Sequence, residues 1–133
     1  IAYMNLDDIR HQYIDNLSGG QRQRAYIAMT LAQDTDYILL DEPLNNLDMK
    51  HSVQIMQVLR KLATELNKTV VIVIHDINFA SCYSDYIVAM KNGKLVHQGE
   101  VNHIMQSPVL QDIYDMTIPI QDIDDHKIAV YFR

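Results

Sequence analysis

The chain has 133 residues, of which 48% are hydrophobic and 21% are charged, as expected for one globular domain or part of one. Its formal net charge of −6 disfavours a nucleic-acid-binding surface. The single cysteine, Cys82, excludes an internal disulfide and a cysteine-based zinc site. No apolar run approaches the roughly 20 residues that a membrane-spanning helix needs, so any membrane association should depend on a partner protein.

A glycine-containing loop follows an amphipathic stretch whose apolar residues predict a short helix within residues 1–16. The loop, LSGGQ at residues 17–21, leads into a helix predicted over residues 21–33. Glycines let a phosphate approach the backbone, and the N–H groups at a helix N-terminus attract anions. The alternative is an ordinary helix start with Ser18 as its N-cap. The residues of the loop leave both interpretations open.

A short apolar run, Tyr37 to Leu40, leads directly into two carboxylates, Asp41 and Glu42. Such a run predicts a buried parallel strand, and Pro43 ends it. Open α/β sheets bind ligands at the carboxyl ends of their strands, where this pair would lie. Two adjacent carboxylates suit a magnesium site beside a water-activating base. The alternative is a strand end whose acids simply face solvent.

A helix predicted from Met49 to about Leu66, with Asn67 as its stop, precedes a second strand at Thr69–Ile74. β-Branched residues fill this strand, so we expect it to be buried on both faces of a parallel sheet. Strand, helix and strand together predict a βαβ unit. His75 follows directly and should lie beside the two carboxylates, although a histidine at a strand end is often purely structural. The predicted apolar stripe of the helix comprises Val53, Met56, Leu59, Leu62, Ala63 and Leu66.

The remaining residues predict a short helix at 78–83 and a hairpin of strands 86–90 and 95–98 around Asn92-Gly93. Ser107 is predicted as the N-cap of a helix that ends near Asp115, with proline at the first helical position. Two last strands are expected at residues 117–123 and 127–132. The other histidines show no metal-ligand spacing and are interpreted as surface residues: His11, His51, His97, His103 and His126.

The order of LSGGQ, YILLDEP, LNNLD and VIVIHD resembles that of the ATP-binding cassette (ABC) ATPases, and these stretches look most like the ATPases of bacterial iron–siderophore importers. The resemblance implies an α/β fold: a partial P-loop NTPase with parallel core strands flanked by helices, followed by C-terminal hairpins. It assigns residues 1–33 to the end of a helical subdomain with the signature loop. Residues 34–100 would form the core, and residues 101–133 a C-terminal helix and strands.

The resemblance also implies roles for individual residues. Asp41 would hold Mg²⁺ through water, Glu42 would orient and polarise the attacking water, and His75 would contact the γ-phosphate of ATP. Asn46 and Asp48 belong to the stretch that resembles the D-loop, in which Leu44 departs from the frequent serine or threonine. The signature residues would act in trans on the ATP of an opposite subunit: Ser18, Gly19, Gly20 and Gln21.

One motif of the family is missing, because no G-x-x-x-x-G-K-[ST] occurs in the sequence. The resemblance therefore implies the C-terminal portion of a cassette, inactive alone, whose missing phosphate-loop strand would pair beside Thr69–Ile74. Its partners would be a second ATPase subunit in a head-to-tail homodimer, a membrane permease and, indirectly, a substrate-binding protein. The location would be peripheral, at the cytoplasmic face of a bacterial membrane. Two alternatives remain: a cytosolic ABC ATPase without a transport role, and a scaffold fragment without catalysis.

Overall fold

The computed structural model describes residues 19–132, which divide into two compact units after His75. The helix predicted within residues 1–16 and the predicted N-cap Ser18 lie outside the described residues. Within the described range, no helix combines the length and the apolar character that crossing a membrane requires.

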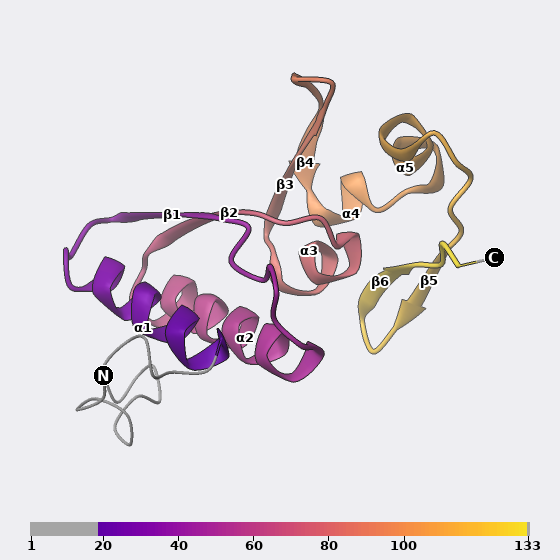
Figure 1. The fold of residues 1–133 in the computed structure, drawn as a ribbon. Helices are drawn as coiled ribbons and strands as arrows, with labels where there is room; N and C mark the ends of the chain where they lie inside the picture. The colour runs from indigo at the N-terminus through magenta and orange to yellow at the C-terminus, as the bar shows by residue number, and fades with distance from the viewer. Residues whose placement is uncertain (1–18, 133) are drawn as a thin grey trace. The chain divides into compact units, whose positions relative to one another are not determined.

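The first unit is a βαβ arrangement preceded by a helix, as the sequence predicts (Figure 1). Strands β1 and β2 pair in parallel, with Tyr37 opposite Thr69 and Asp41 opposite Val73. This register aligns the carboxyl ends of the two strands at the same edge, where the predicted site residues follow. The elements are α1 (Gly19–Leu31), β1 (Tyr37–Asp41), α2 (Met49–Glu65) and β2 (Thr69–Val73).

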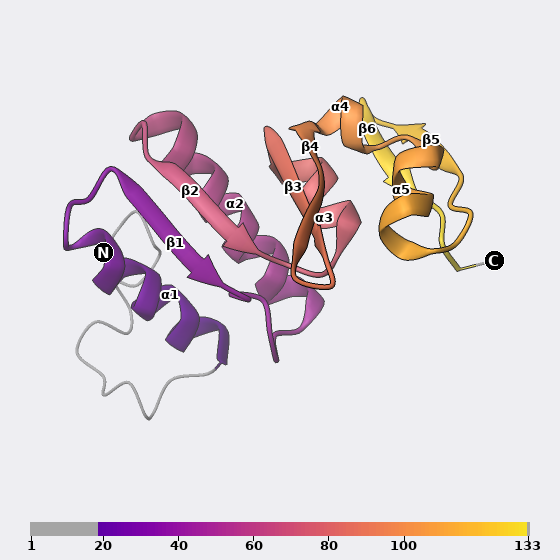
Figure 2. The same cartoon turned by 90° about the horizontal axis from the view of Figure 1, so that it is seen from above.

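Both helices of this unit lie on one side of the two strands (Figures 1 and 2). Ile38 is 1% exposed, whereas Leu39, its neighbour on the opposite face of β1, is 71% exposed. On β2, Val71 and Val73 are half exposed in the same way. The prediction of burial on both faces is therefore wrong for the described residues, because a strand alternates its side chains and only one face has helices against it.

Helix α2 buries its apolar face almost as its periodicity predicts. Met56, Leu59 and Leu62 are buried, but Leu66 lies beyond the helix and is half exposed. The helix ends where expected, because Asn67 takes a left-handed backbone conformation with φ of 52°. The full set of buried residues on α2 is Ser52, Ile55, Met56, Val58, Leu59 and Leu62.

The second unit contains two antiparallel hairpins and three helices, of which α4 was not predicted. Strands β3 and β4 turn at Asn92 and Gly93, whose φ values of 52° and 75° are those of the predicted Asn-Gly hairpin. Ser107 is not the N-cap of α5, because Gln106 takes that place and the Ser107 hydroxyl donates to the carbonyl of Ile118. The elements are α3 (Ile77–Tyr83), β3 (Tyr86–Lys91), β4 (Lys94–Glu100), α4 (Val101–Ile104), α5 (Ser107–Tyr114), β5 (Ile120–Ile123) and β6 (His126–Ala129).

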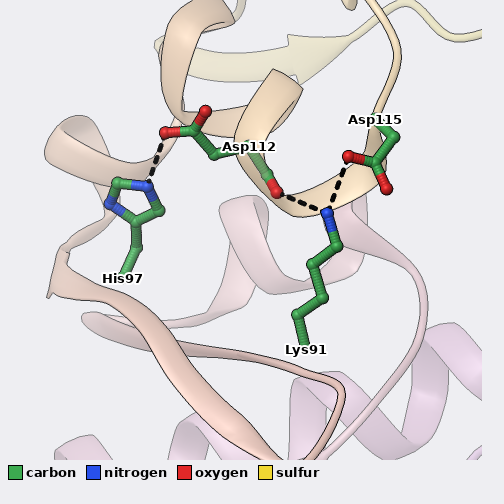
Figure 3. Close-up of polar contacts among 4 residues, drawn as sticks. All are labelled: Lys91, His97, Asp112 and Asp115. Carbon is green, nitrogen blue, oxygen red and sulfur yellow. Dashed lines mark hydrogen bonds and ion pairs between the residues drawn. The ribbon is translucent and has the colours of Figure 1, made fainter.

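Polar contacts tie α5 to the first hairpin of this unit (Figure 3). The Lys91 ammonium donates to the carbonyl of Asp112 at 2.9 Å and to the carboxylate of Asp115 at 2.7 Å. A lysine at this end of a helix satisfies a carbonyl that has no partner within the helix. His97 lies beside the same helix, with its Nε2 3.1 Å from the Asp112 carboxylate.

Helix α3 holds the last strand through side-chain hydrogen bonds. The Asn78 amide accepts from the backbone N–H of Ala129 at 2.7 Å and donates to the Ala129 carbonyl at 3.2 Å. The Ser81 hydroxyl donates to the carbonyl of Lys127 at 2.6 Å. Asn78 thus completes the hydrogen bonding of a fully buried residue at the end of β6.

Candidate functional site

The carboxyl ends of β1 and β2 bring an acid and a histidine together. The backbone N–H of Glu42 donates to the carbonyl of Val73 at 3.0 Å, which continues the strand pairing one residue beyond β1. From there the Glu42 carboxylate reaches His75, whose Nε2 contacts Oε1. The predicted proximity of these two residues is therefore confirmed, while their catalytic roles stay predictions.

The turn after β1 fixes the Glu42 carboxylate. The Asn45 side-chain amide donates to Oε2 of Glu42, and the Asn45 backbone N–H donates to the Glu42 carbonyl at 3.2 Å. Glu42 itself has φ of 51°, a conformation uncommon outside glycine. The hydrogen bonds from His75 and then Asn45 hold the pKa of Glu42 below its ordinary value. The same hydrogen bonds hold the Glu42 carboxylate in one orientation at the ends of the two strands.

Asp41 is the last residue of β1 and is exposed beside Glu42. Among residues 19–132, no cluster of three or more histidine, cysteine or acidic side chains could enclose a metal ion. A single carboxylate is still a usual ligand for Mg²⁺, which is commonly bound through one or two carboxylates with waters and substrate phosphates as its other ligands. Asp41 can therefore serve as a single anchor for Mg²⁺ bound with a nucleotide.

The predicted signature residues lie at the start of α1. Gly19 and Gly20 are its first two residues, Gln21 is the third, and Ser18 lies outside the described residues. A Cβ atom added to Gly19 would lie 3.5 Å from Leu47 Cδ2, an ordinary contact. A Cβ atom added to Gly20 would lie 2.2 Å from Cδ2 of His51, too close for any real atom. The N-terminus of α1 thus packs directly against the segment at residues 46–51.

That segment contains the predicted D-loop residues. Asn46 is exposed and has φ of 63°, while Asp48 is the N-cap of α2. The Asp48 carboxylate accepts from the backbone N–H of His51 at 2.8 Å, and Nδ1 of the same histidine lies 2.7 Å away. These two hydrogen bonds, the backbone one first, hold the pKa of Asp48 below its ordinary value. Asp48 therefore has a capping role that the motif alone does not reveal.

His51, interpreted from the sequence as a surface residue, is partly buried in the structure. Its side chain is only 30% exposed and fills the space beside Gly20. The spacing Asp48-x-x-His51 at a helix start is a signal for the carboxylate contact. The contact with Gly20 spans 31 positions of the sequence and follows only from the packing of α1 on α2.

The sequence is similar to a known protein family and to several curated proteins. The family described as ABC transporter matches residues 1–45. The petrobactin import ATP-binding protein YclP of Bacillus subtilis is 66% identical over 132 residues, which are 99% of this chain and 52% of that protein. The ferric enterobactin transport ATP-binding protein FepC of Escherichia coli is 42% identical over 111 residues, covering 84% of this chain and 41% of that protein. The chain thus spans about half the length of the curated relatives it matches.

Solved structures of ABC transporter proteins share the fold of this chain. A structure described as a metal-chelate type ABC transporter in an inward-facing conformation has a TM-score of 0.86 at 27% identity, covering 98% of this chain and 54% of that one. The dimeric ATP-binding cassette MJ0796 bound to ADP and Pi has a TM-score of 0.62 at 36% identity. The match covers 75% of this chain and 44% of that one. The chain is thus similar to ABC transporter ATPases in sequence along almost its whole length, and to their solved structures in fold. Among these ATPases it is similar to the ATP-binding proteins of siderophore importers.

Proposed function

We propose that this chain forms the C-terminal part of the ATP-binding subunit of an iron–siderophore importer, in which ATP hydrolysis drives uptake. The observation that carries the proposal is the contact between Glu42 and His75 at the aligned ends of two parallel strands, next to Asp41. The names of several relatives support the substrate class, since they describe import of petrobactin, iron hydroxamate and enterobactin. The phosphate-binding loop would come from an N-terminal half, and we call both halves together the complete subunit.

Glu42 acts as the base toward the attacking water. Both of its oxygens are hydrogen-bonded, one to His75 and the other to Asn45. We expect His75, which is 77% exposed, to leave Oε1 and contact the γ-phosphate of bound ATP. Oε1 then becomes free for water while Asn45 still fixes the carboxylate. Phosphoryl transfer requires mainly positioning and charge, which these three side chains supply.

Asp41 would hold Mg²⁺ through a water molecule, and this ion would neutralise charge on the phosphates. The residues on α1 would act on the nucleotide of the opposite subunit in a head-to-tail homodimer. The α1 N-terminus suits this role, because the first N–H groups of a 13-residue helix have no partner within the helix. Asn46 and Asp48 would line the same dimer interface. The signature set is Ser18, Gly19, Gly20 and Gln21.

The transport role requires partners that this chain does not contain. A membrane permease would couple closing and opening of the ATPase dimer to import, and a substrate-binding protein would deliver the iron–siderophore complex to it. The complete subunit would then be peripheral to the cytoplasmic face of the membrane. Co-purification with a permease supports transport, whereas full ATPase activity without any membrane partner favours a cytosolic ABC ATPase.

The test is the substitution Glu42→Gln in the complete subunit. We expect ATP binding to persist and phosphate release to fall about 10²- to 10⁴-fold, the range of general base catalysis. The matched control is Glu100→Gln, which alters an exposed carboxylate at the start of α4 and should leave turnover unchanged. Parental turnover in Glu42→Gln would remove Glu42 as the base. Loss of turnover in both variants would point to a general effect on folding.

A further inference from the structure

We propose that His51 is a positioning residue for ATP hydrolysis, which holds the D-loop residue Asp48 and the signature residue Gly20 in a fixed relation. This inference rests on the proposed function, because it assumes that these residues face a nucleotide of the partner subunit. It goes further by assigning a role to a histidine that belongs to none of the recognised motifs.

The first contact of His51 is with Asp48. One carboxylate oxygen, Oδ1, lies 2.8 Å from the backbone nitrogen of His51 and 2.7 Å from its ring nitrogen Nδ1. An ionised carboxylate such as that of Asp48 can only accept hydrogen bonds. Nδ1 must therefore carry the proton, which fixes the tautomer of a neutral His51 and the orientation of its ring.

The second contact is with Gly20. The position of a Cβ on Gly20 would lie 2.2 Å from Cδ2, 2.6 Å from Cγ and 3.0 Å from Nε2 of His51. The imidazole thus lies against the backbone of a buried glycine, in space that any other residue would occupy with its side chain. This packing explains why a glycine occupies position 20, because a larger residue would collide with the His51 ring. Close approach of a phosphate to the backbone would be a second reason for glycine there.

One imidazole therefore links the starts of two helices, α1 and α2, that lie far apart in the sequence. A second, apolar contact supports the link, because Leu47 lies next to Gly19 at ordinary packing distance. Displacement of the α1 N-terminus would move the His51 ring and with it the Asp48 carboxylate. Rigid support of this kind matters for catalysis, since small errors in the position of reacting groups lower the rate steeply.

The test uses three substitutions of His51 in the complete subunit. His51→Asn keeps an N–H donor near the Nδ1 position, His51→Phe keeps a ring without a donor, and His51→Ala keeps neither. We expect kcat of the asparagine variant to stay within about threefold of the parent, and kcat of the other two to fall about tenfold or more. KM for MgATP should stay within about threefold in all three, because the substitutions leave the phosphate-binding loop of the complete subunit unchanged.

His97 provides the matched control, since its ring also contacts an aspartate, Asp112, in the second unit (Figure 3). His97→Asn and His97→Phe should leave both kcat and KM unchanged. Parental kcat in His51→Phe would overturn the proposal, and so would a kcat of His51→Asn no higher than that of His51→Ala. If the alanine variant does not fold, His51→Gln replaces it, because its amide lies near Nε2 and away from Asp48.

A spectroscopic measurement separates this inference from the proposed function. Long-range ¹H–¹⁵N spectra of the complete subunit with ¹⁵N-labelled histidine report the tautomer of each ring, and the His51→Asn spectrum assigns the His51 signals. We expect the Nδ1–H form for His51. An inactive parental protein with this spectrum would contradict the proposed function alone. An active parental protein with His51 in the Nε2–H form would overturn this inference alone.

Discussion

A methyl group added at position 20 tests the packing of α1 against α2. In Gly20→Ala the new Cβ would begin 2.2 Å from His51 Cδ2, whereas ordinary contact begins at 3.4 Å. The ring must therefore retreat by about 1.2 Å, and Nδ1 cannot then keep its 2.7 Å contact with Asp48. Overpacking of this kind costs about 1–3 kcal/mol. Replacing a glycine within a helix by alanine stabilises the helix by about 0.5–1 kcal/mol, so the expected net loss lies between about 0 and 2.5 kcal/mol.

Urea denaturation of the complete subunit measures this loss. Gly19→Ala is the matched control, because its Cβ would meet only Leu47 at 3.5 Å and should cost little. The double variant Gly20→Ala/His51→Ala should be more stable than the sum of the two single changes predicts, since removal of the ring makes room for the methyl group. Strictly additive effects of the two single changes would refute the contact.

Two further substitutions address the catalytic edge, which is the pair Glu42 and His75 at the carboxyl ends of β1 and β2, and the second unit. His75→Ala should lower phosphate release by roughly 10²-fold or more while MgATP binding persists, because Glu42 keeps only its contact with Asn45; parental release would exclude His75 from the reaction. Asn78→Ala should lower the free energy of unfolding by about 1–3 kcal/mol, since it leaves the N–H and carbonyl of fully buried Ala129 without their partner. Hydrogen exchange should then accelerate at Ala129, and an unchanged exchange rate there would contradict the assigned contact.

The βαβ unit and its catalytic edge could be predicted from the sequence because local patterns determine both. An unbroken apolar run before Asp41 and a β-branched run before His75 indicate parallel strands, whose carboxyl ends meet at one edge. The contact of Glu42 with His75 then follows from topology alone. The hairpin at Asn92-Gly93 was predictable for a similar reason, since that dipeptide tolerates the positive φ values the turn requires.

Features that depend on packing between elements were not predictable. Exposure of Leu39 and Val71 depends on what covers the outer face of β1 and β2, and apolar content alone does not report this. The proline after Ser107 predicts that Ser107 is the N-cap of the helix. In the structure, however, the Ser107 hydroxyl donates a hydrogen bond to the carbonyl of Ile118. His51 belongs to none of the recognised motifs, and its contact with Gly20 arises only when α1 packs on α2.

The central claim is that two subunits share each catalytic site, with Glu42 acting in its own subunit and the signature loop acting on the partner's nucleotide. Covalently linked pairs of complete subunits test it most directly. Glu42→Gln removes the base, and Ser18→Glu places a negative charge where the signature loop would meet phosphate. Placed on different subunits, the two changes leave one intact site, so hydrolysis should continue at about half the parental rate. Placed together on one subunit, they damage both sites, and hydrolysis should be lost. Activity in the second arrangement and none in the first would contradict the account.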